Sequence, residues 1–205
     1  MRQLDIREIT GDEKQQIDEV VSIHLAAFEG FFLTFMGRGF LRRMYVSYCE
    51  HSGSALLGAF SDGNLAGFLA YSENMSGLYR FMLTRKLFPF VWYSLGAFFR
   101  RPVVFLRLIR ALLKPSEARR EEAYVELASI GVRPDMRLLG TGSQLVAALK
   151  KRIDFTRYAY ITLETDAVDN EAANLFYQKN GFVLERTYET REGRKMREYR
   201  YRGLV

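Results

Sequence analysis

The sequence predicts an α/β (α+β) fold: a mixed central sheet of about six to seven strands with helices on both faces. Three observations support this. Strand-like and helical patterns alternate over both halves of the chain, Asp62-Gly63 separates two apolar runs as in a β-hairpin, and a glycine-rich turn joins a buried strand to a helix. The expected organisation is a single domain, 1–205, with a helical insertion at about 76–121.

The first 75 residues alternate between strand and helix patterns. Leu4 and Ile6 alternate with polar neighbours, and Thr10 or Asp12 is a candidate cap for the helix that follows. Gly30 opens an aromatic link towards a second helix. The elements expected here are a strand over 2–9, a helix ending near Phe28, a helix over about 38–50, and strands over 54–60 and 64–72.

The predicted insertion contains a basic, apolar segment. Residues 78–114 hold eight Lys/Arg and no Asp/Glu, and residues 87–99 carry no charge. Thirteen uncharged residues are too few to span a bilayer. After Pro102, basic residues recur at helical spacing on an apolar helix. Two interpretations stay open: a helical hairpin packed on the domain or on a homodimer partner, and a peripheral contact with membrane, lipid or acyl chains.

The last third repeats the strand–helix order. The expected elements are a strand over 123–132, a helix over 138–153, a strand over 158–164, a helix over 170–179, and strands over 182–188 and 194–201.

Composition narrows the function classes. The single cysteine, Cys49, excludes a disulfide framework and a multi-cysteine zinc site, and it fits a reducing compartment. The first 20 residues are polar, without a secretory pattern, so we expect a cytoplasmic protein, either free or peripheral at the inner membrane face. The arginines of the basic segment lack polar base-reading neighbours, which makes nucleic acid an unfavoured partner. No metal site is expected.

The glycine-rich turn is typical of an anion site. Gly140 and Gly142 allow close approach of the backbone, and the first turn of the following helix has unpaired N–H groups. A P-loop would need a Lys-Ser/Thr pair where Ser143-Gln144 stands. A dinucleotide fingerprint would need a third glycine and an early position in the chain.

Two motifs together resemble the GNAT superfamily of N-acetyltransferases. The first is R-x-x-G-x-G at residues 137–142, and the second is N-x-x-A-x-x-x-Y-x-x-x-G-F, from Asn170 to Phe182. Their order and spacing match the family. The resemblance covers residues 123–190 well and residues 1–75 loosely, and it says nothing about 76–121.

The resemblance implies a GNAT fold and acetyl-CoA as the co-substrate. It implies that the pyrophosphate binds the main chain of the loop, and that Ile130 and Val132 pair with the pantetheine arm. Asn170, Asn174 and Lys179 are further candidate cofactor contacts. The full set expected to bind the cofactor is Ile130, Val132, Arg137, Leu138, Leu139, Gly140, Thr141, Gly142, Ser143, Asn170, Asn174 and Lys179.

Tyr177 and Glu126 are the candidate catalytic residues. Tyr177 matches the family tyrosine that faces the sulfur of coenzyme A, although it could instead be only a packing aromatic. Glu126 could accept the amine proton, directly or through water, or else bind the acceptor or a neighbouring strand. His24 and Phe31 are candidate substrate contacts, with a core histidine as the alternative for His24. Asn170 could instead only cap its helix.

These observations lead to one hypothesis and one alternative. The hypothesis is an N-acetyltransferase that moves an acetyl or acyl group from acetyl-CoA to the primary amine of a small molecule by direct attack in a ternary complex. An amino sugar or a lipid-linked precursor is the expected kind of acceptor. The alternative is a GNAT-fold module that binds coenzyme A without catalysis and uses its basic insertion for assembly or membrane docking.

Overall fold

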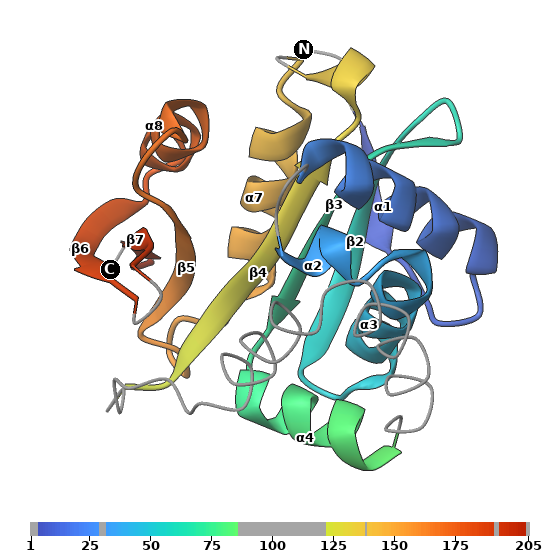
Figure 1. The fold of residues 1–205 in the computed structure, drawn as a ribbon, viewed down its shortest axis with the longest axis horizontal. Helices are drawn as coiled ribbons and strands as arrows, with labels where there is room; N and C mark the ends of the chain where they lie inside the picture. Colours follow the sequence, from blue (N-terminus) through green and yellow to red (C-terminus); the bar gives the residue numbers. More distant parts are fainter. Residues whose placement is uncertain (1–3, 29–31, 86–121, 138, 191–192, 204–205) are drawn as a thin grey trace.

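The computed structural model describes residues 4–28, 32–85, 122–137, 139–190 and 193–203, and within them the chain forms one seven-stranded mixed sheet with helices on both faces (Figure 1). The strands lie in the order β1-β2-β3-β4-β5-β7-β6. Neighbours are antiparallel except β4 and β5, which are parallel. This confirms the predicted fold class.

The elements follow the predicted order, with shifts of a few residues at their ends. The strands are β1 (Asp5–Glu8), β2 (Ser54–Ser61), β3 (Asn64–Ser72), β4 (Tyr124–Val132), β5 (Tyr160–Asp166), β6 (Val183–Glu189) and β7 (Lys195–Tyr201). The helices are α1 (Lys14–Ala27), α2 (Phe32–Phe35), α3 (Arg38–Glu50), α4 (Met75–Arg85), the 3₁₀ turn η1 (Pro134–Met136), α7 (Thr141–Arg152) and α8 (Glu171–Lys179).

Two local predictions can be compared directly with the structure. The hairpin at Asp62-Gly63 is confirmed: β2 and β3 pair antiparallel, and both turn residues have positive φ, 50° and 79°. The predicted cap by Thr10 or Asp12 is wrong, because Glu13 is the N-cap of α1 and no side chain caps it. The Glu13 carboxylate instead accepts a hydrogen bond from Thr10 N at 2.8 Å.

Two apolar cores lie on opposite faces of β2 and β3. Alternate strand residues point to opposite faces, so Leu56 and Phe68 pack with α1 and α3, whereas Leu57 and Leu69 pack with α7. Because both faces are covered, these two strands are buried almost from end to end. β4 pairs with this buried half of the sheet through β3.

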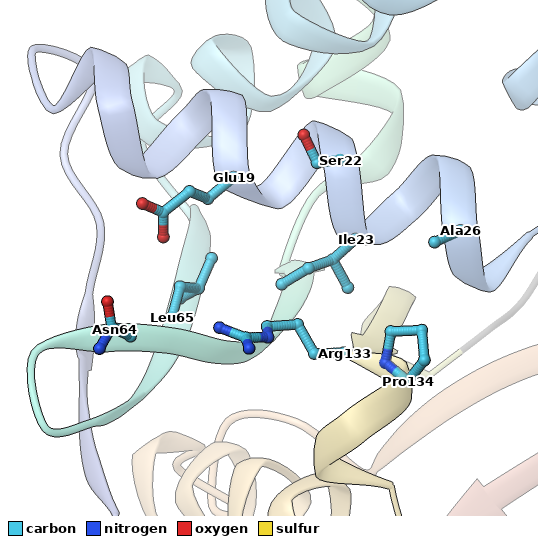
Figure 2. Close-up of a pocket in the computed structure, with 8 residues that line it drawn as sticks. All are labelled: Glu19, Ser22, Ile23, Ala26, Asn64, Leu65, Arg133 and Pro134. Carbon is cyan, nitrogen blue, oxygen red and sulfur yellow. The ribbon is translucent and has the colours of Figure 1, made fainter.

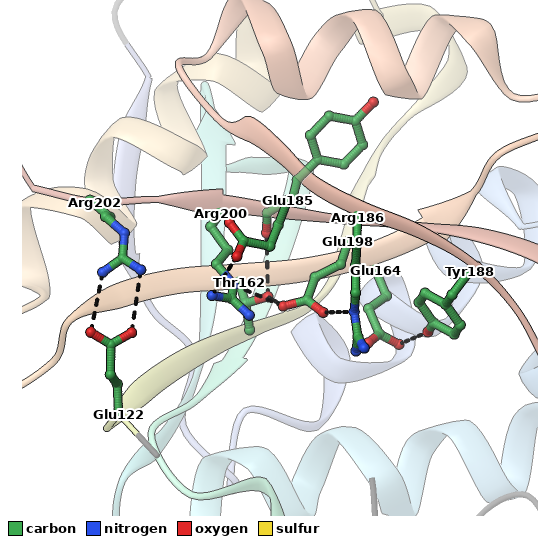
Figure 3. Close-up of polar contacts among 10 residues, drawn as sticks. Glu122, Thr162, Glu164, Glu185, Arg186, Tyr188, Glu198, Arg200 and Arg202 are labelled. Carbon is green, nitrogen blue, oxygen red and sulfur yellow. Dashed lines mark hydrogen bonds and ion pairs between the residues drawn. The ribbon is translucent and has the colours of Figure 1, made fainter. Parts of the chain in front are cut away.

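The other half of the sheet has one apolar and one polar face. Ile161, Leu163 and Tyr199 belong to the apolar core that contains the buried residues of α7, called the α7 core below. The opposite face carries charged and hydroxyl side chains (Figure 3). Glu198 is fully buried and accepts hydrogen bonds from Arg186 Nε at 2.8 Å and Arg200 Nε at 2.9 Å. The α7 core therefore covers one face of both halves of the sheet. The second half differs from the first in its other face, which is polar instead of apolar.

Within the predicted insertion, the described part is α4, which packs on α3. The remainder of the predicted helical hairpin, residues 86–121, lies outside the described residues. In the part of the chain that the structure describes, no helix is long and apolar enough to cross a membrane.

Candidate active site

The site is built where β4 and β5 separate. The two strands pair only through Tyr124–Tyr160, Val125–Ile161 and Glu126–Thr162, although β4 continues to Val132 and β5 to Asp166. Figure 1 shows the two strands side by side at their beginnings and diverging towards the ends that meet α7 and α8. Beyond Glu126, one edge of β4 therefore has no described strand beside it.

The main chain of Ile130 and Val132 points to this open edge. Arg133 N donates to Ala66 O of the β3 side at 2.9 Å, and backbone groups alternate in direction along an antiparallel strand. Gly131 therefore faces β3, while Ile130 and Val132 face away from it. Their N–H and C=O groups are oriented as pairing with an extended arm requires.

The glycine loop leads from the far end of β4 into α7. Gly140 is the N-cap of α7 with φ of 86°, a left-handed conformation that favours glycine. Gln144 N donates to Gly140 O at 3.0 Å as the first described bond of the helix, so the earlier N–H groups of this turn remain available to an anion. No acidic residue stands in that turn.

The side chains around the loop differ in their surroundings. Thr141 is buried and its hydroxyl donates to Met136 O at 3.5 Å, so only its main chain is available to a ligand. A Cβ on Gly142 would come within 3.1 Å of the Phe176 ring, which places α8 against the loop. Arg137 and Leu139 are exposed and Ser143 is half-buried, while Leu138 lies outside the described residues.

Tyr177 lies in an aromatic cluster on α8. Its ring centroid is 5.3 Å from that of Phe176 and 6.1 Å from those of Phe182 and Tyr199. Burial raises the pKa of Tyr177 to about 12. The phenol therefore stays protonated at neutral pH, as a hydrogen-bond donor to a sulfur must be.

The three polar candidates on α8 have different surroundings. The Asn174 amide is 3 % exposed; it donates to Asn170 O at 2.7 Å and Asp166 O at 3.0 Å, and accepts from the Tyr199 hydroxyl at 2.9 Å. This geometry does not favour its predicted contact with a cofactor. Asn170 is the N-cap residue, but its side chain makes no capping bond and instead donates to Thr165 Oγ1 at 2.7 Å. Lys179 is exposed at the helix end.

Glu126 lies at the point where the strands separate, and its residue is partly buried. It is in register with Thr162 of β5, so both side chains lie on the polar face. Burial, with a smaller contribution from the Glu126 charge, raises the pKa of Tyr79 of α4. The carboxylate is therefore close to α4, at the narrow end of the opening.

Of the two predicted substrate contacts, only His24 lies in the described part of the chain, where it is buried. His24 is only 2 % exposed, its ring packs against Phe28 at 4.6 Å, and burial lowers its pKa to about 4. It lies in the core because it shares the apolar face of α1, which was the alternative interpretation. Phe31 lies outside the described residues.

Sequence reasoning missed two polar residues, Tyr45 and Ser129, that form a hydrogen-bonded chain with His24. Its Nδ1 is 2.6 Å from the Tyr45 hydroxyl of α3, which is 3.3 Å from Ser129 Oγ of β4. Ser129 could have been noticed as a hydroxyl within an otherwise apolar strand pattern, whereas nothing distinguished Tyr45 from other helical aromatics.

A separate hollow of about 370 Å³ lies between α1, the start of β3 and the residues after β4 (Figure 2). Arg133, which lines it, is already paired with Asp135 at 2.6 Å. Arg133 and Glu126 are seven residues apart along β4, about 23 Å at the rise of a strand. The hollow is lined by Glu19, Ser22, Ile23, Ala26, Asn64, Leu65, Arg133 and Pro134.

Solved structures of known proteins share this architecture. An acetyltransferase of the GNAT family from Bacillus cereus is 14% identical, with each chain covered over 100% and a TM-score of 0.60. A ribosomal-protein-alanine N-acetyltransferase from Brucella melitensis is 17% identical over 97% of this chain and 99% of that one, with a TM-score of 0.61. At such identities the likeness shows the fold alone.

An acetyltransferase from Bacillus anthracis, solved in complex with acetyl coenzyme A, is 18% identical over 78% of this chain and 68% of that one, with a TM-score of 0.50. No curated protein matches the sequence. The model of the acetyltransferase (GNAT) family matches residues 18–182, which include the diverging strands, the glycine loop and α8. With most of the chain matched, this protein belongs to the GNAT family of acetyltransferases, enzymes that use acetyl-CoA.

Proposed function

We propose that the protein is an N-acetyltransferase that moves the acetyl group of acetyl-CoA to the primary amine of a small molecule, by direct attack in a ternary complex. One observation supports this most: the opening between β4 and β5 has an anion-binding helix start at one end and a carboxylate, Glu126, at the other. The cofactor would lie along the edge of β4, with its thioester near Glu126 and the acceptor on the polar face.

In the proposed reaction Glu126 takes a proton from the acceptor, and Tyr177 donates a hydrogen bond to the leaving thiolate. The amine nitrogen attacks the carbonyl carbon, the C–N bond forms and the C–S bond breaks. An acceptor that arrives as an ammonium ion first gives one proton to water, which frees the lone pair for attack. Glu126 takes the second proton, which the nitrogen loses as the amide forms, directly or through water, and coenzyme A leaves as a thiolate. With a pKa of about 12, the Tyr177 phenol is a weaker acid than a thiol of pKa about 8.5, so it stabilises the thiolate by donating a hydrogen bond.

The acceptor is proposed from the charge of the polar face. Glu126 and Glu164 lie on this face, and carboxylates attract an amine that arrives as an ammonium ion. An amino sugar or a lipid-linked precursor fits such a face, the latter through the basic, apolar sequence of 78–114. Sedimentation with vesicles of anionic lipid tests the lipid-linked proposal, and a protein that stays in the supernatant contradicts it.

The first test is thermal unfolding with acetyl-CoA, free CoA and ATP. A ligand present at about 100 times its dissociation constant adds roughly 2.7 kcal/mol of stability. We expect both coenzyme A species to raise the melting temperature and ATP to leave it unchanged. No shift with either coenzyme A species would contradict the proposed cofactor site.

The second test is a screen of small amines with the wild-type protein and Glu126→Gln. For an acceptor found in the screen, we expect Glu126→Gln to lower kcat/KM by about 10²- to 10⁴-fold and to keep the shift with acetyl-CoA. Glu122→Gln, which changes an exposed carboxylate paired with Arg202, is the control and should keep full activity. Equal activity of the two variants would remove Glu126 as the base.

A further inference from the structure

A hydrogen-bonded chain leads from the core to the strand that borders the opening. It joins His24 of α1, Tyr45 of α3 and Ser129 of β4, with 2.6 Å between His24 Nδ1 and Tyr45 Oη and 3.3 Å between Tyr45 Oη and Ser129 Oγ. His24 is 2 % exposed and Tyr45 is fully buried. A buried polar chain costs stability unless its members are satisfied, so its one unsatisfied atom needs an explanation.

That atom is His24 Nε2, which is buried and has no hydrogen-bond partner among the described residues. Burial keeps the imidazole neutral at neutral pH, so one ring nitrogen carries a proton and the other a lone pair. An orphaned buried N–H is rarer than an orphaned acceptor, so the proton belongs on Nδ1. His24 then donates to the Tyr45 oxygen.

The direction of the remaining bonds follows. Burial raises the pKa of Tyr45, so its phenol keeps its single proton. Because the Tyr45 oxygen accepts from His24, its proton is directed to Ser129 Oγ. The Ser129 hydroxyl thereby accepts, and its own proton is left for a third partner. No other described residue takes that proton.

Ser129 lies where a thioester would be held. It comes three residues after Glu126, the last residue of β4 that pairs with β5. It also flanks the irregularity of the β3–β4 ladder at Ala70/Tyr71, where the strand carries one extra residue. Its side chain is on the face of α3, and the residue is partly exposed. An arm that extends from the glycine loop along β4 reaches this point at its end.

We infer that the Ser129 hydroxyl donates a hydrogen bond to the thioester carbonyl oxygen of bound acetyl-CoA, and that Tyr45 and His24 are positioning residues that fix its direction. The inference rests on the proposed binding of acetyl-CoA along β4. A donor set in place before the reaction stabilises the carbonyl oxygen as it gains negative charge during attack. The cost of the orphaned His24 atom then has a functional reason.

The test compares binding of acetyl-CoA and free CoA by calorimetry, because only acetyl-CoA carries the carbonyl oxygen. We expect Ser129→Ala and Tyr45→Phe each to weaken acetyl-CoA about two- to tenfold and to leave CoA unchanged. Ser47→Ala removes another buried hydroxyl from α3, one that donates to Arg43 O, and should change neither affinity. This control separates loss of packing from loss of the donor.

The outcomes distinguish a failure of this inference from a failure of the proposed function. Equal weakening of both ligands in Ser129→Ala, or no weakening of either, would overturn the inference alone. Absence of binding of either ligand to the wild-type protein would overturn the proposed function as well.

A second measurement needs no variant. Long-range ¹H–¹⁵N NMR correlations of the wild-type imidazole report which nitrogen of His24 is protonated. We expect Nδ1–H at neutral pH. Protonation at Nε2 would reverse the chain, so that Tyr45 donates to His24 and Ser129 to Tyr45, and would overturn the inference.

Discussion

The two halves of the sheet are held together in different ways. In β2 and β3 nearly every residue is buried, because helices cover both faces. In β6 nearly every residue is exposed, and the polar face of β5, β7 and β6 is organised around the buried carboxylate of Glu198 (Figure 3). One half depends on packing and the other depends in part on charge pairing.

The opening lies where the two halves meet. The apolar core that contains α7 continues across β4 and β5, whereas the other face changes from apolar on β2 and β3 to polar on β5 and β7. At this boundary the strands β4 and β5 pair at three positions and then diverge. The sites proposed for the cofactor and the acceptor therefore lie between a packed half and a polar half.

The largest expected effect concerns packing. Phe68→Ala removes a fully buried ring of β3 that lies 5.2 Å from the Tyr45 ring. We expect a loss of about 4 kcal/mol in the free energy of unfolding, measured with denaturant at neutral pH, and little change of that loss with salt. A loss below about 1 kcal/mol would contradict a packed first half.

The next effect concerns the charges of the second half. Glu198→Gln keeps the side-chain shape but leaves Arg186 and Arg200 facing a neutral amide. We expect about 3 kcal/mol of destabilisation, because two charge-assisted hydrogen bonds to a buried carboxylate are replaced by weaker contacts with an amide. Glu122→Gln breaks an exposed pair, 3.3 Å long, and should cost less than about 1 kcal/mol. Equal losses in the two variants would remove the distinction between the halves.

The smallest effect concerns the one buried imidazole of the packed half. The pKa of His24 is about 4 in the folded protein and about 6.5 in the unfolded chain, so the unfolded chain takes up its proton first as pH falls. Between pH 7 and 5 this group should lower the free energy of unfolding by about 2 kcal/mol. Denaturant curves of the wild-type protein and His24→Gln at both pH values give the difference, and identical pH dependence would contradict it.

Much of the fold could be predicted because it rests on local patterns. The Asp62-Gly63 turn, the strand before the glycine loop and the helix after it each have a short sequence signature, and each formed as predicted. The position of β7 between β5 and β6 has no such signature, since it depends on pairing with residues of β5 that are 30 to 40 positions away. The ends of the helices and strands differ from the predicted ends for the same reason, because tertiary contacts and not local propensity decide where an element ends.

In the candidate site, too, local features could be predicted and non-local ones could not. Glycine conformation and helix position are local, so Gly140 formed the N-cap turn that the motif implies. Side-chain direction is not local. Asn174 turned inward to Asp166 and Tyr199, and His24 turned into the core beside Tyr45. Sequence spacing placed both residues on the correct helices but could not show which atoms their side chains would contact.

The strand order also has a consequence for synthesis on the ribosome. Because β7 lies between β5 and β6, β6 has no neighbour among the described strands until Lys195–Tyr201 has emerged. A nascent chain can pair β1 to β4 early, but it holds β6 as an unpaired edge until translation has passed Tyr201. The edge of β5 that pairs with β7 also stays open until then, over the 30 to 40 residues that separate the paired positions, so the sheet closes only at the end of this stretch.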